Sequence, residues 1–246
     1  MKQDGELLPV ARTLRVGFKL YRARAYRTLE DRRLFSSDPM KHLGPPPNAY
    51  ARAGRMNAEG VSVLYCATDV ETCLAELRPA IGSQLAVAAF QTTEDLRILD
   101  FTRLAQVAFP DDLDIFHSDY FIQKDRQALL RHLHFLISQP ITPEREANYL
   151  ITQTMAEFLA HVHSQPFDGI AFSSTQRVAG TNIVIFPRRD GFLPNPSKTF
   201  RINLVEKSFR NYRTQAVNYQ HVPDHSIHNP HAQSMFDDIF DDEIPY

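Results

Sequence analysis

The apolar residues of this chain come in short runs, and the longest strongly apolar stretch covers only residues 85–90. A membrane-spanning helix needs about 20 consecutive apolar residues, so the sequence predicts none. The first ten residues include Asp4 and Glu6 and lack the apolar segment of a secretory signal. These features favour a soluble globular protein built from short elements, with the cytosol as its compartment.

The spacing of the apolar runs predicts an α+β fold with about six or seven strands and three helices. Helical spacing covers residues 68–77, 126–137 and 142–162, and we expect a capping box at the start of the first helix, from Thr68 to Glu71. Thr142 and Pro143 are typical of the start of the last helix. Three consecutive prolines predict a loop over residues 35–48. Runs typical of strands lie at residues 16–23, 61–67, 85–90, 96–101, 169–172, 182–186 and 200–205.

The length of 246 residues favours one large domain with extensions, since a domain averages about 150 residues. We expect an N-terminal leader or edge element over residues 1–15, a main domain over residues 16–205 and a C-terminal extension over residues 206–246. The last eleven residues hold five acids and no base, and we expect this tail to be disordered.

Charge is uneven along the chain. Residues 11–55 contain eleven Lys or Arg against three acids, which indicates an anionic partner. A phosphate-bearing small ligand fits this bias as well as nucleic acid does, and solvated surface arginines would explain it too.

Several chemistries are disfavoured by what the sequence lacks. Cys66 and Cys73 are too few for a disulfide framework or a four-thiolate zinc site, and buried small side chains explain them better. Four histidines between residues 221 and 231 have only Asp224 near them as a further ligand, so a polar tail is favoured over a metal site. No phosphate-binding loop, dinucleotide-binding glycine motif or hydrolase nucleophile elbow is present.

Polar residues remain at the ends of predicted elements. Glu76 is the most informative, because an acid beside the apolar positions Leu74 and Leu77 needs a partner. An ion pair between Arg22 and Glu76 would be the purely structural explanation. The candidates are Arg22, Arg55, Asn57, Tyr65, Glu76, Ser173, Ser174 and Asn182.

Taken in order, these residues and their neighbours resemble the RES domain family over about residues 18 to 190. The matching segments are Leu20-Tyr21-Arg22, Gly54-Arg55-Met56-Asn57-Ala58-Glu59-Gly60, Leu64-Tyr65-Cys66-Ala67, Leu74-Ala75-Glu76, Asp168-Gly169-Ile170-Ala171-Phe172-Ser173-Ser174 and Gly180-Thr181-Asn182. Met56 departs from the family pattern, which has an aromatic residue at this position. Two serines stand where the family motif G-I-x-F-x-S has one, and the spacing of that motif favours Ser174.

The resemblance implies an ADP-ribosyltransferase-like fold with short mixed or antiparallel strands in two packed sheets and flanking helices. It also implies NAD+ as a substrate rather than a resident cofactor, and toxins of toxin–antitoxin pairs among the relatives. We therefore expect NAD+ and an antitoxin protein as partners, and neither nucleic acid nor a membrane.

The residue chemistry fits cleavage of the nicotinamide–ribose bond. A carboxylate such as Glu76 can stabilise the positive charge that develops on the ribose, with Arg22 and Tyr65 as further catalytic groups. Tyr65 can stack on nicotinamide. Arg22 and Arg55 can bind the pyrophosphate.

Hydrogen bonds to the substrate are expected from the remaining candidates, which are Asn57, Ser173, Ser174 and Asn182.

The acceptor stays open at this point. Water would make the protein a glycohydrolase, phosphate a phosphorylase, and a protein side chain an ADP-ribosyltransferase. A nucleotide-binding interaction module without turnover, and a nucleic-acid-binding protein, are the alternatives from other classes.

Overall fold

The computed structural model describes residues 10–104, 149–188 and 195–217, together with isolated positions between 120 and 137. All named elements belong to one compact unit that ends at Gln215. The predicted helix over residues 126–137, the predicted cap at Thr142 and the C-terminal tail lie outside the described residues, apart from two isolated helix positions.

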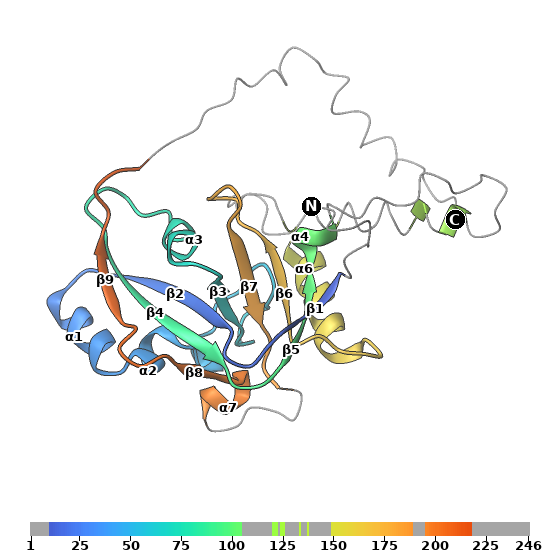
Figure 1. Cartoon of the computed structure of the whole chain (residues 1–246), viewed down its shortest axis with the longest axis horizontal. Helices are drawn as coiled ribbons and strands as arrows, with labels where there is room; N and C mark the ends of the chain where they lie inside the picture. Colours follow the sequence, from blue (N-terminus) through green and yellow to red (C-terminus); the bar gives the residue numbers. More distant parts are fainter. Residues whose placement is uncertain are drawn as a thin grey trace, which may run out of the picture. The chain divides into compact units, whose positions relative to one another are not determined.

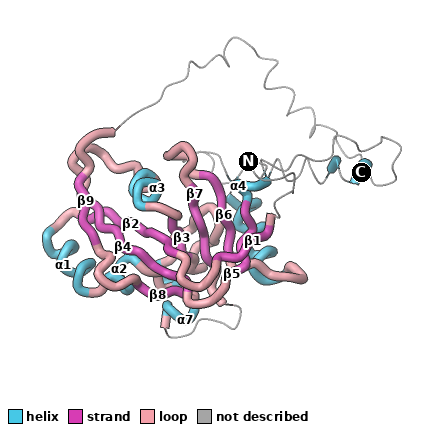
Figure 2. Tube along the Cα trace, in the orientation of Figure 1, coloured by secondary structure: helices cyan, strands magenta, loops and turns pink. Residues whose placement is uncertain are grey.

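In the described part of the chain, nine strands pair into one mixed sheet. Figures 1 and 2 show how these strands are arranged. The order along the sheet is β1-β5-β6-β7-β3-β2-β4-β8, and β9 pairs with the same edge of β4 as β8. Among the strands of the described residues, β5 and β6 form the only parallel pair. The strands are β1 (Ala11–Leu14), β2 (Lys19–Tyr26), β3 (Leu64–Ala67), β4 (Gln84–Thr92), β5 (Leu96–Asp100), β6 (Gly169–Ser173), β7 (Thr181–Ile185), β8 (Ile202–Leu204) and β9 (Arg210–Arg213).

The expectation of two packed sheets was wrong. The halves β1-β5-β6-β7-β3 and β2-β4-β8 are joined by a short antiparallel pairing of β2 with β3, in which Tyr21 lies opposite Ala67. This junction has one pair in register, whereas β2 and β4 have eight. The sheet is therefore continuous, but its narrowest hydrogen-bonded junction lies at its centre.

Helices flank this sheet, and their bounds correct several predictions. The loop predicted over residues 35–48 contains the end of α1 and all of α2, and Phe200 belongs to α7 rather than to a strand. Residues 16–18 precede β2 instead of opening it. The helices are α1 (Leu29–Ser37), α2 (Pro39–Leu43), the 3₁₀ turn η1 (Asn48–Tyr50), α3 (Val70–Ala75), α4 (Phe101–Leu104), α6 (Tyr149–Glu157), the π-helical turn η3 (Phe158–Val162) and α7 (Pro196–Phe200).

The start of α3 also differs from the prediction. Asp69, not Thr68, is the N-cap, and its carboxylate accepts a hydrogen bond from the backbone N–H of Thr72 at 2.8 Å. An acid at this position satisfies a helical N–H that has no partner inside the helix. Glu76 is the C-terminal cap of the same helix, and Arg78 then adopts a left-handed backbone with φ of 46° before Pro79.

Alternation along the strands divides the core between the two faces of the sheet. On β3, Leu64 and Cys66 belong to the cluster that includes Phe35 and Leu43 of α1 and α2. Tyr65, between them, packs against the cluster that holds the buried residues of α6 and η3. A smaller third cluster joins Ala67, Cys73 and Val87 beneath α3.

Candidate active site

The turn after η1 is held by its own side chains. Gly54 and Asn57 form an isolated antiparallel bridge, and Asn57 Nδ2 lies within hydrogen-bond distance of the carbonyl oxygens of Arg52, Ala58 and Val61. Gly54 is required by close approach, because a Cβ there would lie 2.7 Å from the Tyr65 hydroxyl oxygen. This turn is the G-R-M-N segment found in the sequence.

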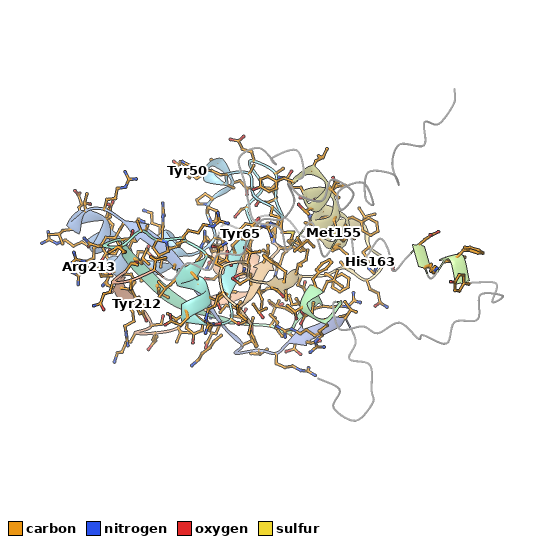
Figure 3. All side chains as sticks on the ribbon, turned by 90° about the horizontal axis from the view of Figure 1, so that it is seen from above. Tyr50, Tyr65, Met155, His163, Tyr212 and Arg213 are labelled. Carbon is orange, nitrogen blue, oxygen red and sulfur yellow. The ribbon has the colours of Figure 1, made fainter. Side chains whose placement is uncertain are left out.

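Tyr65 is locked against that turn. Its hydroxyl donates to Asn57 Oδ1 at 2.9 Å and accepts from the backbone N–H of Met56 at 2.9 Å. Burial raises the pKa of Tyr65 to about 12, so the phenol is neutral at physiological pH. The ring is positioned for contact with a ligand, whereas the hydroxyl is occupied by the protein. Figure 3 labels Tyr65 near the centre of the described body.

Helix α6 fixes the same turn from outside. Gln153 Nε2 donates to the carbonyl oxygens of Gly54 and Asn57 at 2.9 and 3.0 Å, and Thr152 Oγ1 donates to that of Arg55 at 2.6 Å. Thr152 is buried. Sequence reasoning missed both residues, because nothing in the helical pattern of this segment marks which polar side chains face a distant turn.

Glu76 is held by two donors from the other half of the chain. Ser174 Oγ donates to Glu76 Oε1 at 2.6 Å, and Asn182 Nδ2 donates to the same oxygen at 2.7 Å. Within the described residues, Oε2 has no hydrogen-bond partner. One oxygen thus fixes the carboxylate, and the other remains able to accept a bond from a ligand.

The two arginines occupy different surroundings. Arg22 Nη1 donates to the carbonyl oxygen of Gly44 at 2.7 Å, and the described residues contain no ion pair between Arg22 and Glu76. The Arg55 guanidinium lies 5.9 Å from the centre of the Phe172 ring, within the range of a cation–π contact. Burial lowers the pKa of both arginines, yet both remain charged because a guanidinium keeps its proton in proteins.

These groups surround a cleft of about 310 Å³, a size within the range of small-molecule sites. The cleft lies where β2 and β3 meet, at the narrow junction of the sheet. Its other walls come from α3, the end of β6, the start of β7 and the turn that contains Gly54. Six predicted site residues line it: Arg22, Arg55, Tyr65, Glu76, Ser173 and Asn182.

The remaining two predicted residues lie just behind the lining. Ser174 reaches the site through its bond to Glu76, and Asn57 reaches it through its bond to Tyr65. The structure therefore places both serines at the site in different ways, Ser173 on the cleft wall and Ser174 on the carboxylate.

Both cysteines also line this cleft, and both are free and buried. Burial raises the pKa of Cys66 to about 12 and that of Cys73 further still. The thiolate is the reactive form of cysteine, so these thiols are poor nucleophiles at neutral pH. Their burial confirms the prediction of buried small side chains, and the structure adds that they contribute apolar surface to the cleft.

Asp168, which opens the D-G-I-A-F motif, has a structural role. Its carboxylate forms an ion pair with Arg201 at 2.5 Å and accepts from the backbone N–H of Arg97 at 2.7 Å. Gly169 follows it because a Cβ there would lie 2.2 Å from the carbonyl oxygen of Val184. This part of the motif thus holds β6 between β5 and β7.

Two kinds of feature are absent from the described residues. None of the helices there combines the length and the apolar character that crossing a membrane requires. No group of three or more His, Cys, Asp or Glu side chains in that part of the chain is arranged to hold a metal ion.

Comparison with known proteins agrees with the motifs. The chain matches the RES domain over residues 19–204, and it therefore belongs to the RES domain family. The matched range contains every cleft residue named above. A search of curated proteins found no match.

Proposed function

We propose that this RES domain protein consumes NAD+ by cleaving its nicotinamide–ribose bond, as a glycohydrolase or a phosphorylase. One observation carries the proposal. Glu76 projects into an arginine-containing cleft with Oε1 fixed by Ser174 and Asn182, and with Oε2 left for a ligand. Membership of the RES family supports the same substrate.

The carboxylate suits the reaction because positive charge develops on the ribose as nicotinamide leaves. Nicotinamide departs with the electron pair of the broken C–N bond. The anomeric carbon then bonds either to a water oxygen, which releases a proton to solvent, or to an anionic phosphate oxygen, which carries no proton. Glu76 Oε2 would accept a hydrogen bond from a ribose hydroxyl and lie close to the developing charge. Preorganised groups of this kind contribute about 10²–10³-fold to a rate.

The remaining cleft residues supply binding. Arg22 and Arg55 would pair with the pyrophosphate through charge-assisted hydrogen bonds. The Tyr65 ring would stack on nicotinamide, since its hydroxyl is already engaged by the turn. Ser173 and Asn182 would orient the ribose or the carboxamide.

We further propose that the protein is the toxin of a toxin–antitoxin pair, because the RES family is associated with NAD-related toxin activity. An antitoxin would then be a protein that blocks the cleft. Expression of this chain alone in bacteria should lower cellular NAD+ and arrest growth, and expression with Arg55 replaced by Ala should do so much less.

Product analysis tests the reaction and identifies the acceptor. Purified protein is incubated with NAD+ in buffers with and without phosphate, and the products are separated by chromatography. Free ADP-ribose in both buffers indicates a glycohydrolase, and a phosphorylated ADP-ribose formed only with phosphate indicates a phosphorylase. Nicotinamide release that needs an added protein, with ADP-ribose attached to it, would replace the proposal by a transferase. No release with any acceptor, despite binding of NAD+, would identify a binding module.

A further inference from the structure

An ion pair connects the two segments that meet at Glu76. Arg177 lies in the loop between β6 and β7, and its Nη1 donates to Asp69 Oδ1 at 2.8 Å and to Thr72 Oγ1 at 3.0 Å. Asp69 and Thr72 are at the start of α3, whose other end carries Glu76. The loop is thereby tied to the helix about one turn away from the carboxylate.

The tied segments are in close contact. Thr72 is fully buried, and its hydroxyl donates to Asp69 Oδ2 at 2.7 Å. A Cβ on Gly180 would lie 2.6 Å from Thr72 Oγ1 and 3.0 Å from the Cβ of Ser174. The end of the loop therefore packs directly on α3, and a small shift of one segment must move the other.

The same loop orients the hydroxyl that binds Glu76. Ser174 Oγ accepts from the backbone N–H groups of Gln176 and Arg177, both at 3.1 Å. With its acceptor positions used in this way, the hydroxyl hydrogen is directed to Glu76 Oε1. The backbone of Arg177 thus aims Ser174, while its side chain anchors the loop to α3.

We propose that Asp69 and Arg177 are positioning residues that hold Ser174 and Glu76 in register for catalysis. This inference rests on the proposed NAD+ cleavage at Glu76. Although burial opposes its ionisation, hydrogen bonds from Thr72 and the nearby charge of Arg177 lower the pKa of Asp69 overall, so the pair is ionised at neutral pH. The side chains of Arg177 and Asp69 are 43% and 40% exposed, and ion pairs with this much exposure contribute little to the free energy of unfolding. Loss of the pair should therefore affect geometry at Glu76 more than folding.

Asp69→Asn and Arg177→Gln each remove one charge of the ion pair, and Asp69→Asn leaves the helix cap in place. The asparagine keeps an oxygen for the Thr72 backbone N–H, so the helix cap survives while the charge is lost. Each variant should lower kcat for nicotinamide release at least about tenfold, since small misplacements of catalytic groups are costly. The Kd for NAD+ should change less than about twofold, and Arg177→Lys should recover part of kcat.

A double variant measures the energetic coupling between Asp69 and Arg177. Asp69→Asn with Arg177→Gln should be no slower than the slower single variant, because each single change already removes the charge attraction of the same ion pair. The matched control is Arg15→Gln, which removes an exposed ion pair with Asp95, 80 residues away in the sequence. Its kcat should be unchanged. Multiplicative losses in the double variant, or single variants with wild-type kcat, would overturn the proposal.

Amide hydrogen exchange tests the tie without relying on turnover. The loop contains backbone bonds from Ser174 to Gly180 and from Gly180 to Arg177, at 2.8 and 3.1 Å. Exchange at residues 174–180 should be faster in both single variants and unchanged in Arg15→Gln. Wild-type exchange in both variants would overturn the positioning role even if the wild-type protein proved inert toward NAD+, and an inert wild type would separately refute the proposed function.

Discussion

The side-chain amide of Asn182 donates a 2.7 Å hydrogen bond to Glu76 Oε1, although 106 residues separate the two in the sequence. The pairing of β7 brings them together, because Asn182 lies opposite Ala67 on β3 and opposite Phe172 on β6. A register shift of one residue would turn Asn182 to the other face of the sheet. The contact between Asn182 and Glu76 therefore depends on β7 lying between β3 and β6.

Replacing Asn182 by Asp should disable this arrangement. The change exchanges a donor for an acceptor beside the Glu76 carboxylate, so one of the two acids must bind a proton or move away. We expect kcat to fall at least about 100-fold and the free energy of unfolding to fall by about 1–3 kcal/mol. Nicotinamide release and urea denaturation measure the two effects. Asn203→Asp, at an exposed position of β8, should change neither.

The contact between α6 and the arginine turn should appear in substrate binding. Gln153→Met keeps a similar volume but removes both donors to the turn that carries Arg55. The KM for NAD+ should rise several-fold while kcat changes less, because the turn holds a binding group and not Glu76. Thr154→Ala, which removes only an exposed bond to Leu150 within the helix, is the control. A wild-type KM in Gln153→Met would show that α6 does not set the position of Arg55.

The buried phenol of Tyr65 should make the protein sensitive to alkaline pH. Its pKa is raised to about 12 in the folded protein, compared with 10.0 for an ordinary phenol, so the folded state favours the protonated form. The associated stability is fully present below pH 10 and is lost as the pH rises through about 12. Each pKa unit corresponds to about 1.4 kcal/mol, which limits the total loss to about 3 kcal/mol.

Urea denaturation of the wild type and of Tyr65→Phe at several pH values between 8 and about 11.5 isolates this contribution. Tyr65→Phe should be less stable at pH 8, since Met56 N–H and Asn57 Oδ1 lose their partner. Its disadvantage should shrink as the pH rises above 10. A difference that is constant with pH would mean that Tyr65 titrates as an ordinary phenol.

The two thiols in the cleft should resist alkylation. Since burial raises the pKa of Cys66 and Cys73, little thiolate is present at pH 8. Mass spectrometry after brief treatment with iodoacetamide should find both thiols unmodified in the folded protein and both modified in urea. Fast labelling of either thiol in the folded protein would contradict the burial of the cleft wall.

Regular alternation and apolar runs made most strands predictable. β4, β5, β6 and β7 lie within a few residues of their predicted ranges, because each has a nearly continuous apolar face in the core. β9 has the sequence Arg-Asn-Tyr-Arg and is mostly exposed, so no apolar pattern marks it. Helix α1, which was not predicted, does begin with a signal in the sequence, since Thr28 and Asp31 form a capping box.

The residues of the candidate site also fall into those that the sequence predicts and those that it does not. Arg22, Arg55, Tyr65 and Glu76 were predicted from motifs with fixed spacing, and the structure brings them to one cleft. Gln153 and Arg177 were missed, because each acts through a contact with a segment about 100 residues away. Such contacts depend on the sheet order, and the sequence does not reveal that β3 lies between β7 and β2.

The most direct test of the account is nicotinamide release from NAD+ by the wild type and by Glu76→Gln. The glutamine keeps an oxygen for Ser174 and Asn182 but removes the negative charge, so binding of NAD+ should be nearly unchanged. We predict that kcat falls by about 10²–10³-fold or more, while titration calorimetry gives a Kd close to that of the wild type. A Glu76→Gln protein that releases nicotinamide at near the wild-type rate would contradict the central role of this carboxylate.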